Sequence, residues 1–453
     1  MEYSGEVKAR DLIPESGGAS AGDDYLPGSG NSGYSVSHYA LELDYRMASN
    51  RLTGTAVITA TASQPLGRFS LDLTGLVASK VSVDGVRVAK VVQNTQKLTI
   101  TPARPIEAGA SFIVSVRYGG SPGPRRSRWG EVGWEELAEG VIVAGQPCGA
   151  PTWFPCNDHP GDKATMQLAM TTDSPYRVVA NGTLVSRTVR SSRTRWVFET
   201  TEPMATYLAT VQIGYYQSYA LPPARIPQYA YIPEDLAADF GADFGGQSAM
   251  IEVFEKLFGE FPFSEYTVVV TDDDLEIPLE AHGLSVFGRN HVDGHQGEVR
   301  LIAHELAHSW FGNSLTAASW KHIWLHEGFA CYAEWLWSEA SGSTSAAHLA
   351  EHHWTRLNAL PQDFAIGDPG PDLMFDDRLY KRGALTLHAL RVTIRDEAFF
   401  ELLRKWTFEH RHGSVTTEQF LAHVSESSDR PTGPLLAAWL FDTALPKLPP
   451  RRR

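Results

Sequence analysis

The sequence has few cysteines, a shortage of basic residues and no long apolar run. Only three of its 453 residues are cysteine, Cys148, Cys156 and Cys331. They are too few and too scattered for a disulfide framework or a thiolate metal cluster, so we expect small core residues. With 39 Lys and Arg against 53 Asp and Glu, the formal net charge is -14. Because nucleic-acid binding depends on basic side chains that release counterions, no nucleic-acid partner is expected.

The sequence shows neither a membrane span nor a secretion signal. No stretch of about 18 apolar residues occurs. The first residues lack the basic start and apolar core of a signal peptide. We therefore expect no membrane insertion and a cytoplasmic location. A secreted protein whose signal had already been removed would have the same sequence.

Length and residue pattern predict an α+β fold with two domains. The composition, 43% hydrophobic and 20% charged, is that of an ordinary globular protein, and the length exceeds what one core usually organises. Residues 1–33 are rich in Gly, Ser and Pro, which predicts a flexible polar extension. Residues 34–220 alternate in short apolar runs between turn residues, which predicts an antiparallel β domain. Residues 221–453 change to a period near 3.6, which predicts a mainly helical domain.

Seven helices are expected in the second half, with one strand-like stretch at 283–288 among them. The expected helices cover 246–259, 297–311, 321–340, 346–358, 379–395, 397–408 and 416–425. The strand-like stretch comes just before the helix that holds the clearest chemical motif.

That motif is the run His304-Glu305-Leu306-Ala307-His308 in an apolar surround. On a helix, residues four apart lie one turn apart on the same face, so both imidazoles can bind one metal ion. Glu305 is turned aside and can reach a metal-bound water. The motif predicts two zinc ligands and a general base.

A third ligand is expected from the helix that follows. Eighteen residues separate His308 from Glu327, enough for a loop and a second helix that returns beside the first. Two histidines, one carboxylate and one open position are typical of a catalytic zinc site. The alternative is a helix with incidental His and Glu residues. His326 points about 100° away from Glu327 and is expected to be structural or pocket-lining. Glu334 is either a hydrogen-bond partner of a ligand histidine or a solvated carboxylate.

Around this site the sequence resembles the gluzincin aminopeptidases, the family of aminopeptidase N and the leukotriene hydrolases. The resemblance covers about residues 35–445 and leaves out the long carboxy-terminal helical domain of the larger members. It implies a β-sheet saddle followed by a thermolysin-like zinc peptidase domain. The matching segments are HELAHSWFGNSLTAASWKHIWLHEGFACYAEWL from His304, WFPCND from Trp153, ANG from Ala180 and EPMATYL from Glu202.

The resemblance also assigns roles to residues outside the zinc motif. Glu280 matches the glutamate that binds the free amino terminus of a peptide substrate. The strand that starts at Gly283 matches the edge strand that pairs with the peptide backbone. Gln146 matches a glutamine that lines the pocket for the first side chain, and Tyr380 matches the tyrosine that stabilises the oxyanion. The implied activity is zinc-dependent removal of amino-terminal residues from peptides.

Several alternatives stay open at this point. The family pattern around the glutamate is Gly-X-Met-Glu-Asn, whereas this chain has Ile277-Pro278-Leu279-Glu280-Ala281. An endopeptidase or a protease dedicated to maturing one peptide would use the same site. An epoxide hydrolase of the leukotriene hydrolase type is a further alternative, and a non-catalytic binding protein is the least favoured. The sequence does not predict an oligomeric state.

Overall fold

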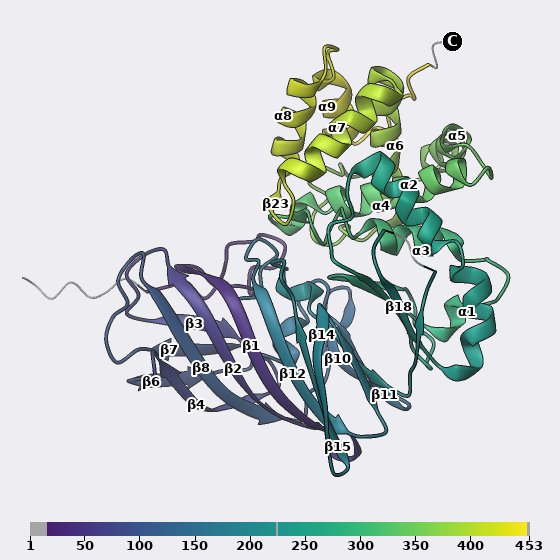
Figure 1. Ribbon diagram of the computed structural model, residues 1–453. Coiled ribbons are helices and arrows are strands. Elements are labelled where there is room, and N and C mark those ends of the chain that lie inside the picture. Colours follow the sequence, from purple (N-terminus) through teal and green to yellow (C-terminus); the bar gives the residue numbers. More distant parts are fainter. Residues whose placement is uncertain (1–15, 223–224, 451–453) are drawn as a thin grey trace, which may run out of the picture.

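The computed structural model describes residues 16–222 and 225–450, which form a β-rich part and a helical part (Figure 1). The expected α+β fold, with a β-sheet domain before a mainly helical domain, is confirmed. The expected extension at 1–15 lies outside the described residues.

The largest sheet of the β-rich part has eight strands, in the order β14-β15-β12-β1-β2-β8-β4-β5. Along β1, alternate residues such as Tyr39, Leu41 and Leu43 are buried, as the period-two pattern requires. The pairing between β1 and β12 is parallel, so the sheet is mixed. The strands are β1 (Tyr34–Arg46), β2 (Arg51–Ala62), β4 (Val77–Val83), β5 (Val86–Arg87), β8 (Ser111–Gly120), β12 (Thr165–Asp173), β14 (Thr183–Arg190) and β15 (Arg193–Glu199).

Two smaller sheets complete this part, in the orders β13-β16-β11-β10-β9 and β3-β7-β6. Cys156 lies in the core that they share with the large sheet, and the three cysteines are buried and unpaired, as expected. The strands are β3 (Phe69–Asp72), β6 (Lys90–Gln93), β7 (Lys97–Thr101), β9 (Arg125–Ser127), β10 (Gly130–Leu137), β11 (Gly140–Ala144), β13 (Arg177–Ala180) and β16 (Val211–Gly214).

Residues 16–33 are packed against the rest of the chain, so the expectation of a loose extension is wrong for them. Asp23 accepts a hydrogen bond from the backbone N–H of Trp320 at 2.9 Å in the helical part. Tyr25 is buried, and its hydroxyl accepts from the N–H of Gly370 at 2.7 Å. The partners of these residues are hundreds of positions away, which local composition cannot reveal.

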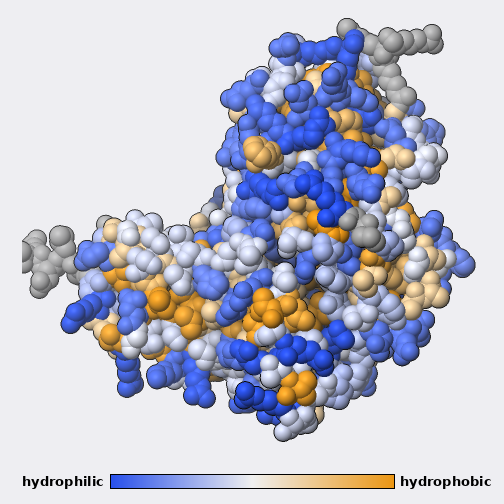
Figure 2. All heavy atoms as spheres, in the orientation of Figure 1, coloured by the Kyte–Doolittle hydropathy of each residue, from blue (hydrophilic) through white to orange (hydrophobic). Residues whose placement is uncertain are grey.

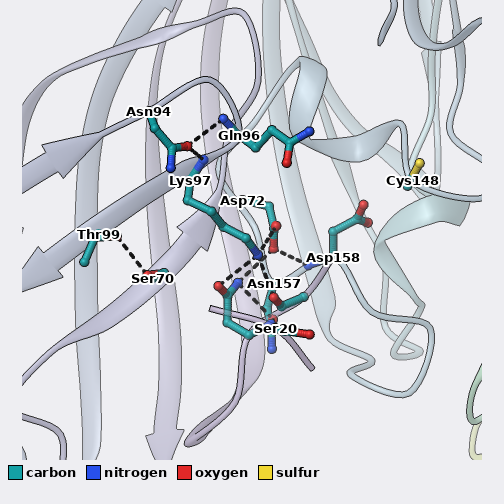
Figure 3. Close-up of polar contacts among 12 residues, drawn as sticks. Ser20, Ser70, Asp72, Asn94, Gln96, Lys97, Thr99, Cys148, Asn157 and Asp158 are labelled. Carbon is teal, nitrogen blue, oxygen red and sulfur yellow. Dashed lines mark hydrogen bonds and ion pairs between the residues drawn. The ribbon is translucent and has the colours of Figure 1, made fainter. Parts of the chain in front are cut away.

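A buried polar network also fixes this segment to the β-rich part (Figure 3). Lys97 Nζ lies 2.6 Å from Asp72 Oδ1. The other oxygen of Asp72 accepts from Asn31 Nδ2 at 2.8 Å and from the N–H of Asp158 at 3.1 Å. Asn157 Oδ1 accepts from the N–H of Asn31 at 2.6 Å. The network therefore joins the segment to the loop that holds Asn157 and Asp158.

The helical part contains a five-stranded sheet in the order β17-β18-β19-β21-β20. Of these strands only β21 was expected. Because β17 pairs with β18, residues 217–220 belong to this sheet. The domain division near residue 220 stays a prediction. The strands are β17 (Gln217–Ala220), β18 (Gln228–Ile232), β19 (Tyr266–Val270), β20 (Leu279–Ala281) and β21 (Leu284–Phe287), with a separate pair, β22 (Thr316–Ala317) and β23 (Ser414–Val415).

The helices agree with the expected ones, with α1 and α9 added. Polar caps explain several helix starts: Ser345, Asp376 and Thr416 each accept a backbone N–H at the start of α5, α6 and α8. The helices are α1 (Ala237–Phe244), α2 (Gln247–Phe258), α3 (Val299–Ala307), α4 (Trp324–Ala340), α5 (Ala346–Asn358), α6 (Asp377–Ile394), α7 (Asp396–Glu409), α8 (Thr417–Ser427) and α9 (Gly433–Phe441). Short 3₁₀ turns are Met47–Ser49, Ala150–Thr152, Thr206–Leu208, Glu234–Leu236, Arg289–His291 and Trp320–His322.

The surface differs between the two parts. On the face shown in Figure 2, apolar patches gather over the β-rich part, whereas hydrophilic side chains prevail over the helices at the top. Among the described helices, none is both long and apolar enough to cross a bilayer.

Candidate metal and substrate site

Helices α3 and α4 bring His304, His308 and Glu327 together, with their donor atoms within 4.8 Å of one another. Oε2 of Glu327 lies 3.5 Å from Nε2 of His304 and 3.6 Å from Nε2 of His308. Ligands at about 2.0–2.1 Å from a tetrahedral zinc ion are about 3.3 Å apart. The three donors thus have the spacing of a zinc site.

The other ring nitrogen of each histidine is bonded elsewhere. His304 Nδ1 lies 2.8 Å from Glu334 Oε1, and His308 Nδ1 lies 2.9 Å from the carbonyl oxygen of Phe311. With the proton on Nδ1 donated to these oxygens, each Nε2 keeps a lone pair for a metal ion. Glu334 was expected to be either a hydrogen-bond partner of a ligand histidine or a solvated carboxylate. The structure supports the hydrogen-bond partner, because the Glu334 carboxylate is buried against His304.

The charge of the site also suits a dication. Four carboxylates, from Glu280, Glu305, Glu327 and Glu334, interact with the His304 imidazole. Burial opposes the charged form of His304, but hydrogen bonds to Glu327 and Glu334 raise its pKa to about 10. An imidazole held beside two carboxylates exchanges its proton for a metal ion when zinc binds. The donor set and its excess negative charge therefore fit Zn²⁺.

Glu305 is placed as a proton acceptor. It is 5% exposed, and its Oε2 has no hydrogen-bond partner among the described residues. Burial raises the pKa of Glu305 to about 7. A carboxylate with this pKa can take up and return a proton near neutral pH.

Two glycines let the helix that carries Tyr380 approach the helix that carries Glu327. A Cβ atom added at Gly328 of α4 would lie 2.8 Å from Cα of Gly383 in α6. The close approach brings the ring of Tyr380 to 6.1 Å from the ring of His304, nearly parallel to it. Burial, Glu327 and Glu280 raise the pKa of Tyr380, so its hydroxyl stays protonated and can donate.

Glu280 of the helical part and Gln146, just after β11 of the β-rich part, are joined by a hydrogen bond. Gln146 Nε2 donates to Glu280 Oε1 at 2.6 Å. Burial and the charges of Glu327 and Glu305 raise the pKa of Glu280. Glu280 also lies in a second group of donor atoms with Glu305 and His308, so it borders the metal position.

Glu280 lies on β20, which is the edge strand of its sheet. The strand that follows Gly283, β21, pairs on both sides with β19 and β20. The expectation that the strand starting at Gly283 is the edge strand is therefore wrong. Gly283 is instead in the turn between β20 and β21, with a φ of +74° that favours glycine.

Two asparagines that the sequence did not single out as site residues hold this turn. Asn313, just after the His-rich helix, donates to the carbonyl of Ala281 at 2.8 Å. Asn181 of the β-rich part donates to the carbonyl of His282 at 3.0 Å. His326 accepts from the N–H of Ala317 at 2.7 Å, which supports its structural reading. Asn313 and Asn181 lie in two of the segments that carry the family resemblance, the run from His304 and ANG, which gave the signal for these contacts.

Comparison with known proteins identifies the class. The Peptidase M1 N-terminal domain matches residues 35–208, and the Peptidase family M1 domain matches residues 243–439. The crystal structure of an M1 zinc metallopeptidase from Deinococcus radiodurans, a mutant bound to a Tyr-Ser-Ala substrate, is 30% identical, with a TM-score of 0.88. The match covers 96% of this chain and 100% of that chain. The chain belongs to peptidase family M1, which confirms the expected family.

Longer relatives match the same region. Aminopeptidase M1-D of Oryza sativa subsp. japonica is 24% identical over 88% of this chain and 49% of its own length. Human endoplasmic reticulum aminopeptidase 1 is 24% identical over 84% of this chain and 44% of its own length. The chain thus spans about half the length of these curated relatives.

Proposed function

We propose that this chain is a zinc-dependent aminopeptidase that hydrolyses the first peptide bond of substrates with a free amino terminus. The observation that carries the proposal is the convergence of His304, His308 and Glu327 beside the paired side chains of Glu280 and Gln146. A metal site next to a carboxylate on an edge strand suits a peptide whose ammonium group binds close to the reacting carbonyl.

His304, His308 and Glu327 would hold the zinc ion. When bound, zinc lowers the pKa of a water molecule and polarises the substrate carbonyl. Glu305 takes the proton of the attacking water and returns it to the leaving amine. The Tyr380 hydroxyl donates to the oxygen that becomes negative during the attack.

The substrate is oriented by its charged end. Glu280 binds the ammonium group, and the amide of Gln146 holds the Glu280 carboxylate through a hydrogen bond to Oε1. The exposed edge of β20 offers backbone groups to the peptide. This arrangement selects peptides with a free amino terminus, and the first peptide bond falls at the metal.

Replacing Glu280 by Gln tests this arrangement. Hydrogen bonds to charged groups contribute about 1.5–3 kcal/mol, so kcat/KM for free peptides should fall about 10- to 100-fold. Products from mixtures of free and acetylated peptides would be measured by mass spectrometry. The control is Glu276→Gln, which changes an exposed glutamate on the loop that leads into β20.

The proposal expects stepwise loss of single residues from free peptides only, with little effect of Glu276→Gln. Internal cuts in both sets of peptides would make the protein an endopeptidase. An absence of cuts in either set would overturn the peptidase proposal.

A further inference from the structure

A two-stranded arm of the β-rich part reaches the segment of the helical part that leads to Tyr380. The arm comprises residues 125–132, that is β9, its turn and the start of β10. Its base is set by the register that pairs Gly133 of β10 with Ala144 of β11. Because Ala144 is the last residue of β11, the arm projects beyond this strand, on the side where the chain continues to Gln146.

The turn of the arm binds the segment 371–375. Trp129 Nε1 donates to the carbonyl of Pro371 at 3.0 Å. The rings of Trp129 and Phe375 meet edge to face, with centroids 5.8 Å apart. Arg128 forms an ion pair of 2.6 Å with Asp372, but both of these side chains are largely exposed. Trp129 is therefore the main contact, because exposed ion pairs contribute little.

The segment bound by Trp129 leads directly into α6. Asp376 caps this helix, and Tyr380 lies in its first turn. The arm thus links the loop after β11, which holds Gln146, to the start of α6, which holds Tyr380. Trp129, Phe375, Gln146 and Tyr380 are all partly exposed, whereas the metal-binding side chains are buried. Partial exposure is what side chains that line an accessible cleft require.

We propose that the Trp129–Phe375 pair closes the pocket for the first side chain of the substrate and gives the pocket its preference for large apolar residues. The inference rests on the proposed function, which places the ammonium group at Glu280 and the first side chain towards Gln146. On that side the arm supplies an aromatic wall, and Trp129 acts as a positioning residue that holds Phe375 in place.

Loss of the Trp129 ring should affect substrates according to the size of their first side chain. A phenylalanyl side chain loses apolar contact when the wall opens to water, whereas an alanyl side chain does not reach the wall. In Trp129→Ala, kcat/KM for a phenylalanyl amide should fall about tenfold through KM. The value for the alanyl amide should change less than about twofold.

The experiment measures hydrolysis of phenylalanyl and alanyl amides that release a coloured amine, with the zinc-loaded full chain. Trp129→Phe keeps a ring at this position and should restore most of the preference. Arg126→Ala is the control on the same arm, because Arg126 is exposed and its ion pair among the described residues is with Glu131 of the arm itself.

The outcomes separate the two proposals. A phenylalanyl-to-alanyl ratio that falls in Trp129→Ala, recovers in Trp129→Phe and is unchanged in Arg126→Ala supports the inference. An equal fall for both amides, or an unchanged ratio, overturns it, since Trp129 would then act on stability alone or not at all. If the unaltered chain hydrolyses neither amide, the proposed function itself fails.

Discussion

Replacing Glu305 by Gln should lower kcat for peptide hydrolysis by about 10²–10⁴-fold while zinc remains bound, because proton transfer by a positioned side chain contributes about this factor. Glutamine has the same shape but cannot accept the proton of the attacking water. The unpartnered Oε2 of Glu305 shows that the carboxylate is not needed for a hydrogen bond within the described residues. The fold and the metal site should therefore persist.

Steady-state kinetics on a free peptide, together with the zinc content of each sample, measures this effect. Glu351→Gln is a suitable control, since it makes the same chemical change on the exposed side of α5. Full hydrolysis by zinc-loaded Glu305→Gln would contradict the assigned role.

The second large effect concerns stability. Replacing Lys97 by Met should lower the free energy of unfolding by about 3–5 kcal/mol, because it leaves Asp72 as a buried charge without its partner. Lys97 is 7% exposed and Asp72 is 3% exposed. Burial and Asp72 already raise the pKa of the neighbouring Asp158 to about 7, so the network has no spare positive charge.

Denaturant unfolding monitored by circular dichroism would test this expectation. Lys80→Met is the matched control, because Lys80 lies exposed on β4 and should change stability by less than about 0.5 kcal/mol. Adding Asp72→Asn to Lys97→Met should recover part of the loss, since the amide carries no charge. Equal stability of the two lysine variants would refute the role of the network.

The zinc ligands could be predicted from the sequence because their geometry is local. His304 and His308 are one helical turn apart, and Glu327 follows at a distance that allows a returning helix. The partner of Glu334 could not be predicted in the same way. A glutamate seven residues after Glu327 lies on the same face of α4, but only the packing of α3 against α4 shows that it meets His304.

Errors in the predicted fold arose where structure depends on distant partners. Residues 16–33 looked like a loose tail because their own composition is polar, yet Asn31 and Tyr25 bind residues far along the chain. Strand order cannot be read from one strand alone, which is why β21 was mistaken for the edge. Helix α9 was not predicted because it is only nine residues long and nearly all of them are apolar, so its sequence has no amphipathic period.

The most direct test of the central claim is the removal and return of zinc. The chelator-treated chain would be titrated with Zn²⁺ while hydrolysis of a free peptide is followed. We expect one zinc ion per chain, no hydrolysis before its addition, and recovery in proportion to bound zinc, with Glu327→Ala binding far more weakly. Hydrolysis that persists in the metal-free chain, or zinc binding that is unaffected by Glu327→Ala, would contradict the account.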